Sequence, residues 1–206
     1  MQIELWLTFL AASMVVLIIP GPTILLVLSY ALTQGRRVAV GMALGVALGD
    51  LVAMTASLLG LGALVMASAT LFSVLKWIGA GYLVYLGIAL LRAGPAKLDL
   101  AGPNPKPVRA IFGHAAIVTA TNPKSIAFFV AFVPQFIQPE ATLAPQFTVL
   151  IATFVALGTA NALAYALLAD RMRRSIRKPA VLTWLNRLGG GVLVAMGALT
   201  ATLGRS

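Results

Sequence analysis

The chain has 206 residues, of which 60% are hydrophobic and only 10% charged, and its 15 Lys/Arg against 5 Asp/Glu give a formal net charge of +10. Soluble domains hold roughly 25% charged residues, so this chain has too little polar surface to cover a water-soluble globule of its size. The absence of cysteine excludes disulfides and cysteine metal sites, and the single histidine excludes bis-histidine haem ligation within one chain. The composition predicts an all-α integral membrane protein.

Six apolar stretches are each long enough to cross a bilayer core, which takes roughly 20 helical residues. The first begins close to the N-terminus, where Met1–Glu4 lacks the basic region of a signal peptide, so we expect this stretch to be a retained helix. The expected transmembrane helices lie near residues 3–32, 39–67, 70–91, 111–137, 142–169 and 181–203.

Most of the basic residues lie in three of the five connections between these spans, and the connections near 67–70 and 138–141 hold none. Short cytoplasmic loops carry an excess of Lys and Arg, so the pattern predicts that both termini lie outside. The positive charge therefore indicates membrane topology rather than nucleic-acid binding. The basic residues in these connections are Arg36, Arg37, Arg92, Lys97, Lys106, Arg109, Arg171, Arg173, Arg174, Arg177 and Lys178.

The chain is predicted to be a single transmembrane domain, residues 1–206, built from two repeats. A proline-rich cytoplasmic linker at 93–110 separates repeat one, about 1–92, from repeat two, about 111–206. Residues 46–50 resemble 155–159, and the glycine pattern of 79–87 resembles that of 189–197, about 110 residues later in both cases. Because three spans is an odd number, the two repeats must be inverted in the membrane, an arrangement that is typical of transporters.

Each repeat begins with a span that proline interrupts, at Pro20-Gly21-Pro22 and at Asn122-Pro123. Proline removes an amide donor and clashes with the preceding turn, and lipid offers no partner to the carbonyls that this releases. A kink used only for packing is one interpretation. Interruptions at equivalent places in two repeats favour the other, a substrate site.

Two opposite charges lie near the centres of spans. Asp50 is the one acid in such a position, and Lys124 falls in the middle of the fourth span. A lysine at that depth costs about 2.5–3.5 kcal/mol on insertion scales, so we expect both side chains to face the bundle interior. They either form an ion pair that locks the helices, or substrate or proton binding competes with that pair.

Smaller features in the second and fifth spans have two interpretations each. Gly41, Gly45 and Gly49 recur every four residues and indicate a close helix contact, within one chain or between chains. Thr159 and Asn161 either bond the released backbone or line a pathway.

These motifs together resemble the lysine exporter (LysE/RhtB) family of bacterial amino-acid exporters over nearly the whole chain. The resemblance rests on Pro20–Pro22, Gln34–Arg37, Gly45–Asp50, Lys76–Gly87, Asn122–Lys124 and Phe132–Phe136. Thr23 stands where the family often has asparagine. The resemblance implies export of amino acids or close derivatives from the bacterial cytoplasmic (inner) membrane by a multi-pass protein. It also implies coupling to the proton-motive force, often in a homodimer, with no cofactor.

Our hypothesis is alternating access between the two repeats, with the broken helices meeting at the bilayer midplane. Asp50 would bind the substrate amine or the coupling proton, and Lys124 would assist the substrate carboxylate. The alternatives are a non-transporting scaffold or sensor subunit, a channel, and an intramembrane enzyme, although we expect no catalytic residues and no metal site. The expected substrate-binding residues are Pro20, Gly21, Pro22, Thr23, Asp50, Asn122, Pro123 and Lys124.

Overall fold

The computed structural model describes residues 2–67, 69–93, 106–138, 141–176 and 179–202, and these residues form helices and no strand. Two short 3-10 turns, Arg36–Val38 and Val133–Phe136, join or extend the helices. The α-helices are α1 (Ile3–Ile18), α2 (Pro22–Gln34), α3 (Ala39–Ala67), α4 (Ala69–Arg92), α5 (Val108–Ala120), α6 (Pro123–Ala131), α7 (Leu143–Ile176) and α8 (Pro179–Thr202).

Each predicted span corresponds either to one long helix or to a broken pair of shorter ones. The first predicted span corresponds to α1 and α2, the fourth to α5 and α6, and the other four to single helices. Three of these have nearly the predicted bounds, and α7 continues seven residues beyond the predicted end at 169. Of the predicted linker, residues 94–105 lie outside the described part of the chain, as do Arg177 and Lys178.

Length and apolar composition identify the membrane-crossing segments only in part. Among the described residues, three helices are long and apolar enough to cross a bilayer: Arg36–Ala63, Ser73–Arg92 and Leu143–Ala169. The pair α1–α2, bent by 54° at its break, adds a fourth when it is counted as one span. These segments make the chain a multi-pass membrane protein.

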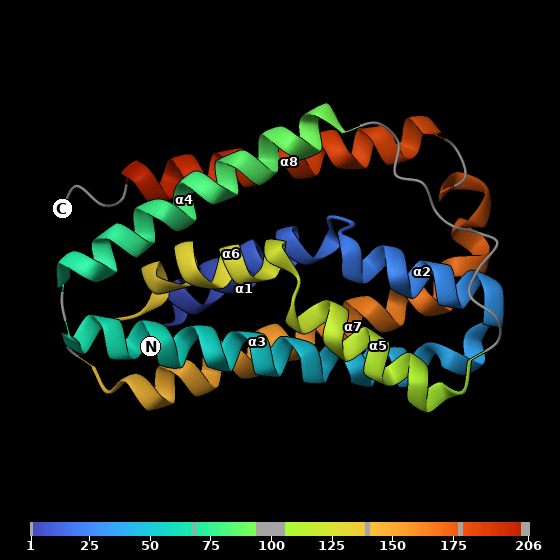
Figure 1. The fold of residues 1–206 in the computed structure, drawn as a ribbon, viewed down its shortest axis with the longest axis horizontal. Coiled ribbons are helices and arrows are strands. Elements are labelled where there is room, and N and C mark those ends of the chain that lie inside the picture. Colours follow the sequence, from blue (N-terminus) through green and yellow to red (C-terminus); the bar gives the residue numbers. More distant parts are fainter. Residues whose placement is uncertain (1, 68, 94–105, 139–140, 177–178, 203–206) are drawn as a thin grey trace.

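The helices are arranged in layers: α1, α2 and α6 lie between the pair α4–α8 and the layer that holds α3, α5 and α7 (Figure 1). The helix α3 packs against α5 and α7, while α4 and α8 cross each other along the opposite side of the molecule (Figure 1). The order of elements also repeats along the chain: a broken pair is followed by two long helices, and then the same order occurs again.

Glycines set the closest of these helix contacts. A Cβ atom built on Gly49 would lie 2.6 Å from the Ala116 carbonyl oxygen and from Thr119 Cβ, so α3 approaches α5 at a distance that only glycine allows. Gly41 and Gly45 likewise face α5, where a Cβ would meet Val108 and the Phe112 carbonyl. The glycine stripe of the second span therefore packs within the chain.

Two hydrophobic clusters fill the two ends of the bundle. One cluster is rich in aromatic rings, and its buried members include Phe9 of α1, Phe128 of α6 and Phe154 of α7. The other joins α2, α5 and the opposite ends of α3 and α7, with Tyr30 and Met42 fully buried in it. The helix breaks lie between the two clusters.

The close contact of α3 with α5 predicts opposite effects for two glycine substitutions on the same helix. Gly49→Ala forces a methyl group into the Ala116 backbone and should destabilise the protein by about 1–3 kcal/mol. Gly60→Ala meets no described atom within 4 Å and should be neutral or stabilising, by up to about 1 kcal/mol, because alanine favours the helix. Melting temperatures of the purified variants in detergent measure this difference, and equal effects at both sites would contradict the packing.

Candidate functional site

The end of α1 lies inside the bundle and leaves main-chain oxygens without their usual partners. The carbonyl of Val16 would normally accept a bond from the amide of residue 20, which is proline and has no N–H. In the structure the Lys124 ammonium takes this place, donating to Val16 O at 2.9 Å and to Ile19 O at 2.7 Å. A lysine from the second broken pair therefore caps the first one.

Two side chains of α7 donate hydrogen bonds to the carbonyls of Leu17 and Ile18, which lie between Val16 and Ile19 in the chain. Asn161 Nδ2 donates to Leu17 O at 2.9 Å, and the Tyr165 hydroxyl donates to Ile18 O at 2.8 Å. The four consecutive carbonyls from Val16 to Ile19, at the end of α1 and its C-cap, thus each accept a bond from a side chain of the second half of the chain. For Asn161 this is the first of the two predicted roles, and Asn161 also lines the central pocket.

The second break contacts the first directly. Asn122 caps the N-terminus of α6, accepting a bond from the Lys124 amide at 3.1 Å, and Pro123 occupies the first turn, where no amide donor is needed. The side-chain nitrogen of Asn122, Nδ2, donates to Thr23 Oγ1 at 3.0 Å. Thr119 Oγ1 lies 3.3 Å from the same threonine oxygen. The two interruptions therefore meet in one polar centre.

Asp50 of α3 lies at this centre with part of its carboxylate unpaired. The residue is 2% exposed, and its Oδ2 finds no hydrogen-bond partner among the described residues. The carboxylate lies against Gly158 of α7, where a Cβ atom would collide with Oδ2. The Lys124 ammonium donates to the carbonyls of Val16 and Ile19 and is not held by Asp50. The first predicted arrangement, an ion pair between Asp50 and Lys124 that locks the helices, is therefore not what the structure shows.

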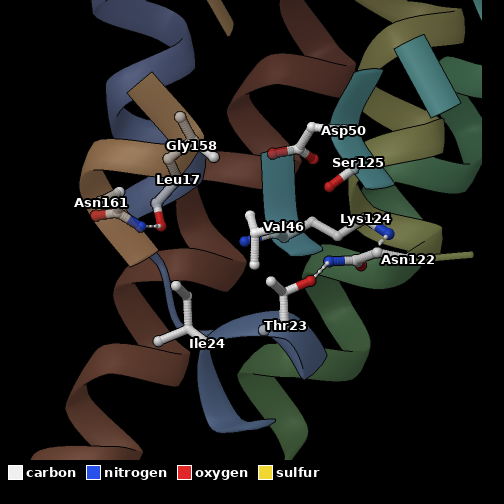
Figure 2. Close-up of a pocket in the computed structure, with 11 residues that line it drawn as sticks. Leu17, Thr23, Ile24, Val46, Asp50, Asn122, Lys124, Ser125, Gly158 and Asn161 are labelled. Carbon is white, nitrogen blue, oxygen red and sulfur yellow. Dashed lines mark hydrogen bonds between the residues drawn. The ribbon is translucent and has the colours of Figure 1, made fainter. Parts of the chain in front are cut away.

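The pocket between these groups is narrow. Figure 2 shows the Lys124 side chain crossing it, with Asp50 and Ser125 on one side and Thr23 and Asn122 on the other. About 20 Å³ is open to the centre of a water molecule, room for one or two waters and too little for an amino acid. The lining residues are Leu17, Gly21, Thr23, Ile24, Val46, Asp50, Asn122, Lys124, Ser125, Gly158 and Asn161.

Five of the eight expected binding residues line the pocket, and the three prolines do not. Pro20 is buried beside it, and Pro22 and Pro123 are exposed at the starts of α2 and α6. The prolines shape the breaks rather than the pocket wall. Sequence reasoning missed Tyr165, although it follows Asn161 by four residues and so lies one helical turn along the same face.

The described residues contain no group of three or more His, Asp or Glu side chains arranged to hold a metal ion. The pocket offers instead main-chain oxygens, hydroxyl and amide groups, one carboxylate and one ammonium. These groups can bind polar solutes through hydrogen bonds and charge.

Comparison with known proteins identifies the family. The profile of the LysE type translocator family matches residues 14–204. The chain belongs to this family.

Relatives of the chain match it over different shares of its length. An uncharacterized membrane protein of Vibrio cholerae is 36% identical over 202 residues, covering 98% of each chain. The homoserine/homoserine lactone efflux protein of Salmonella typhimurium is 34% identical over 203 residues, again covering 98% of each chain. A leucine efflux protein of Salmonella choleraesuis is 36% identical over 135 residues, 65% of this translocator and 64% of the relative. No solved structure matches.

The capping of α1 predicts that two neighbouring substitutions in α7 of the translocator differ in effect. Asn161→Leu leaves the Leu17 carbonyl without a donor and should lower the stability by about 0.5–2 kcal/mol. Thr159→Val should change it little, because the Thr159 hydroxyl donates only to Val155 O of its own helix, at 2.6 Å. Thermal melts in detergent measure both, and the capping role fails if Asn161→Leu melts at the wild-type temperature.

Proposed function

We propose that this translocator exports amino acids or close derivatives across the bacterial cytoplasmic membrane by alternating access, driven by the proton-motive force. The observation that carries the proposal is the buried polar centre where the two broken helix pairs meet, deep within an apolar bundle. The names of the relatives support the substrate class, since homoserine, its lactone and leucine are amino acids or a close derivative of one.

The helix ends at this centre favour the two charged groups of an amino acid. The C-terminal end of α1 presents carbonyl oxygens, which attract an ammonium group, and the N-terminal end of α6 presents the positive end of the helix dipole, which attracts a carboxylate. Both ends border one pocket through Leu17, Asn122 and Lys124. A zwitterion would lie between them.

The proposed topology is six spans in one transmembrane domain. The pairs α1–α2 and α5–α6 would each cross the membrane as one broken span, and α8 would cross as the last, with both termini outside. The repeated order of elements supports two inverted repeats, about 1–92 and 111–206, that rock against each other.

The two hydrophobic clusters would act as alternating barriers. The aromatic cluster lies on one side of the pocket and the cluster around Tyr30 on the other. Rocking of one repeat would separate one cluster at a time and widen the pocket to take an amino acid.

Asp50 would be the proton-coupling group. Its Oδ2 accepts no hydrogen bond within the described part of the chain, so the carboxylate can take a proton without breaking an existing contact. Loss or gain of that proton changes the net charge of a buried pocket, which is the physical means by which a proton gradient can bias the two conformations.

The roles of the two buried charges predict loss of transport without loss of the protein. Asp50→Asn and Lys124→Gln should each abolish efflux of amino acids from loaded proteoliposomes, while both variants remain in the membrane. The matched controls are Glu4→Gln and Arg109→Gln, because both side chains are exposed at helix ends. These controls should transport at the wild-type rate.

The efflux assay also separates this proposal from a scaffold or sensor subunit. If the wild-type protein transports no member of a panel of amino acids, with or without a pH gradient, this result favours a non-transporting role. Full transport by both Asp50→Asn and Lys124→Gln would remove these residues from the mechanism.

The proposed topology can be tested by single cysteines, because the chain has none of its own. Arg37→Cys, between α2 and α3, should react with a membrane-impermeant maleimide only after the cells are permeabilised. Thr142→Cys, before α7, should react in intact cells, because this connection is expected outside. Reaction of both, or of neither, in intact cells would contradict the inverted repeats.

A further inference from the structure

We propose that the Lys124 ammonium is a tethered stand-in for the substrate ammonium. On loading, a primary ammonium of the substrate would displace Lys124 from the carbonyls of Val16 and Ile19, and the displaced side chain would move to Asp50. This inference takes its substrate class from the proposed function. It adds that the substrate is recognised by its ammonium group and that the Lys124 ammonium leaves the site when substrate binds.

The end of α1 is built as an ammonium site. Val16 O and Ile19 O accept bonds of 2.9 and 2.7 Å from one nitrogen, lengths typical of charge-assisted bonds. An ammonium carries three donors and no acceptor, so it suits a site that offers only carbonyl oxygens. Any primary ammonium that reaches these oxygens can replace Lys124 Nζ with the same bonds.

The long and flexible side chain of Lys124 allows its ammonium to move away from the carbonyls of α1. Its flexible four-carbon stem reaches from α6 to α1 across the pocket (Figure 2). Gly21 has no side chain that would crowd the end of this stem. A Cβ atom on Gly21 would lie 3.3 Å from both Lys124 Nζ and Cε. The bonds from Asn161 and Tyr165 to Leu17 O and Ile18 O would hold the end of α1 in place during the exchange.

Asp50 offers the displaced ammonium a destination. Both residues line the same pocket, and Asp50 Oδ2 lacks a partner among the described residues. Before loading, the pocket holds one negative and one positive group; after loading, Lys124 and Asp50 pair, and the substrate ammonium lies on the carbonyl dipoles. No buried charge is left without a partner, which would otherwise be costly in this environment.

The exchange makes the ammonium the essential part of the substrate. Amino-acid esters, which keep the ammonium and lose the carboxylate charge, should bind. N-acetyl amino acids, which keep the carboxylate and lose the ammonium, should not. Movement of the Lys124 stem would also free volume in a pocket that is too small for an amino acid while the stem crosses it.

The first test is chemical rescue of Lys124→Ala. Alanine keeps Cβ, and n-propylammonium supplies the three missing carbons and the ammonium. The variant should melt about 5 °C or more below the wild type, because two charge-assisted bonds are lost. Propylammonium chloride should restore most of this loss in a saturable manner, while tetramethylammonium chloride, which has the same charge but no N–H, should not.

The exposed Arg109→Ala is the control, and propylammonium should not shift its melting temperature. Equal shifts from both ammonium salts, or the same shift in Arg109→Ala as in Lys124→Ala, would overturn the exchange. If Lys124→Ala is recovered only as aggregate, propylammonium added during extraction should increase the yield of monodisperse protein and tetramethylammonium should not.

The second test uses the wild-type protein and needs no variant. L-leucine methyl ester should raise its melting temperature and should compete with L-leucine in binding, whereas N-acetyl-L-leucine should do neither. Homoserine lactone and N-acetylhomoserine lactone form a second matched pair. Equal binding of the N-acetyl compounds would show that the ammonium is not the recognised group.

The two levels of the argument fail differently. Rescue by propylammonium without amino-acid flux in proteoliposomes would support the ammonium site and contradict the proposed export function. Amino-acid flux without rescue, together with binding of the N-acetyl compounds, would support the export function and contradict the ammonium exchange.

Discussion

The structure depends on one constraint, which is that the carbonyl oxygens at the end of α1 must be bonded by protein because lipid cannot bond them. Prolines at 20 and 22 lack the amides that would continue the helix, and the carbonyls of residues 16–19 are left without helical partners. Every donor that satisfies them comes from beyond residue 120, from Lys124, Asn161 and Tyr165. The first half of the chain is therefore complete only when the second half has folded against it, and the polar centre of the molecule follows from this requirement.

Much of this could be predicted from the sequence. Hydrophobic length predicted most helix bounds within a few residues, although α7 continues to Ile176 through polar residues. Proline marked both breaks because its effect on a helix is local. The interior position of Asp50 and Lys124 was likewise predictable, since lipid excludes charge. The partner of Lys124 was not. A sequence shows which carbonyls lose their amides, but which donor reaches them depends on how α6 and α7 pack on α1. Tyr165 was missed for the same reason, because its hydroxyl acts on another helix.

Continuous helix length does not identify every predicted span. The helices α5, with 13 residues, and α6, with 9, are each too short to cross a bilayer, although together they match the broken pair α1–α2. The glycine stripe of α3 settles against α5 rather than against another chain because the small residues opposite it, among them Ala115 and Ala116, allow the backbones to approach. That contact holds one member of the second broken pair beside the helix that carries Asp50.

The geometry also explains why a lysine suits this position better than an arginine. Val16 O and Ile19 O lie three residues apart on one face at the end of a helix, where both can point at a single nitrogen. A guanidinium is a planar fork that matches two oxygens side by side, as in a carboxylate, while an ammonium is a compact charge whose donors rotate to fit. Lysine also has a flexible stem, so it can satisfy the carbonyls and still withdraw. Gly21 between the two prolines keeps the approach open, since any side chain there would crowd the same ammonium. The motif Pro20-Gly21-Pro22 thus does two things: its prolines release the carbonyls, and its glycine admits the cation that covers them.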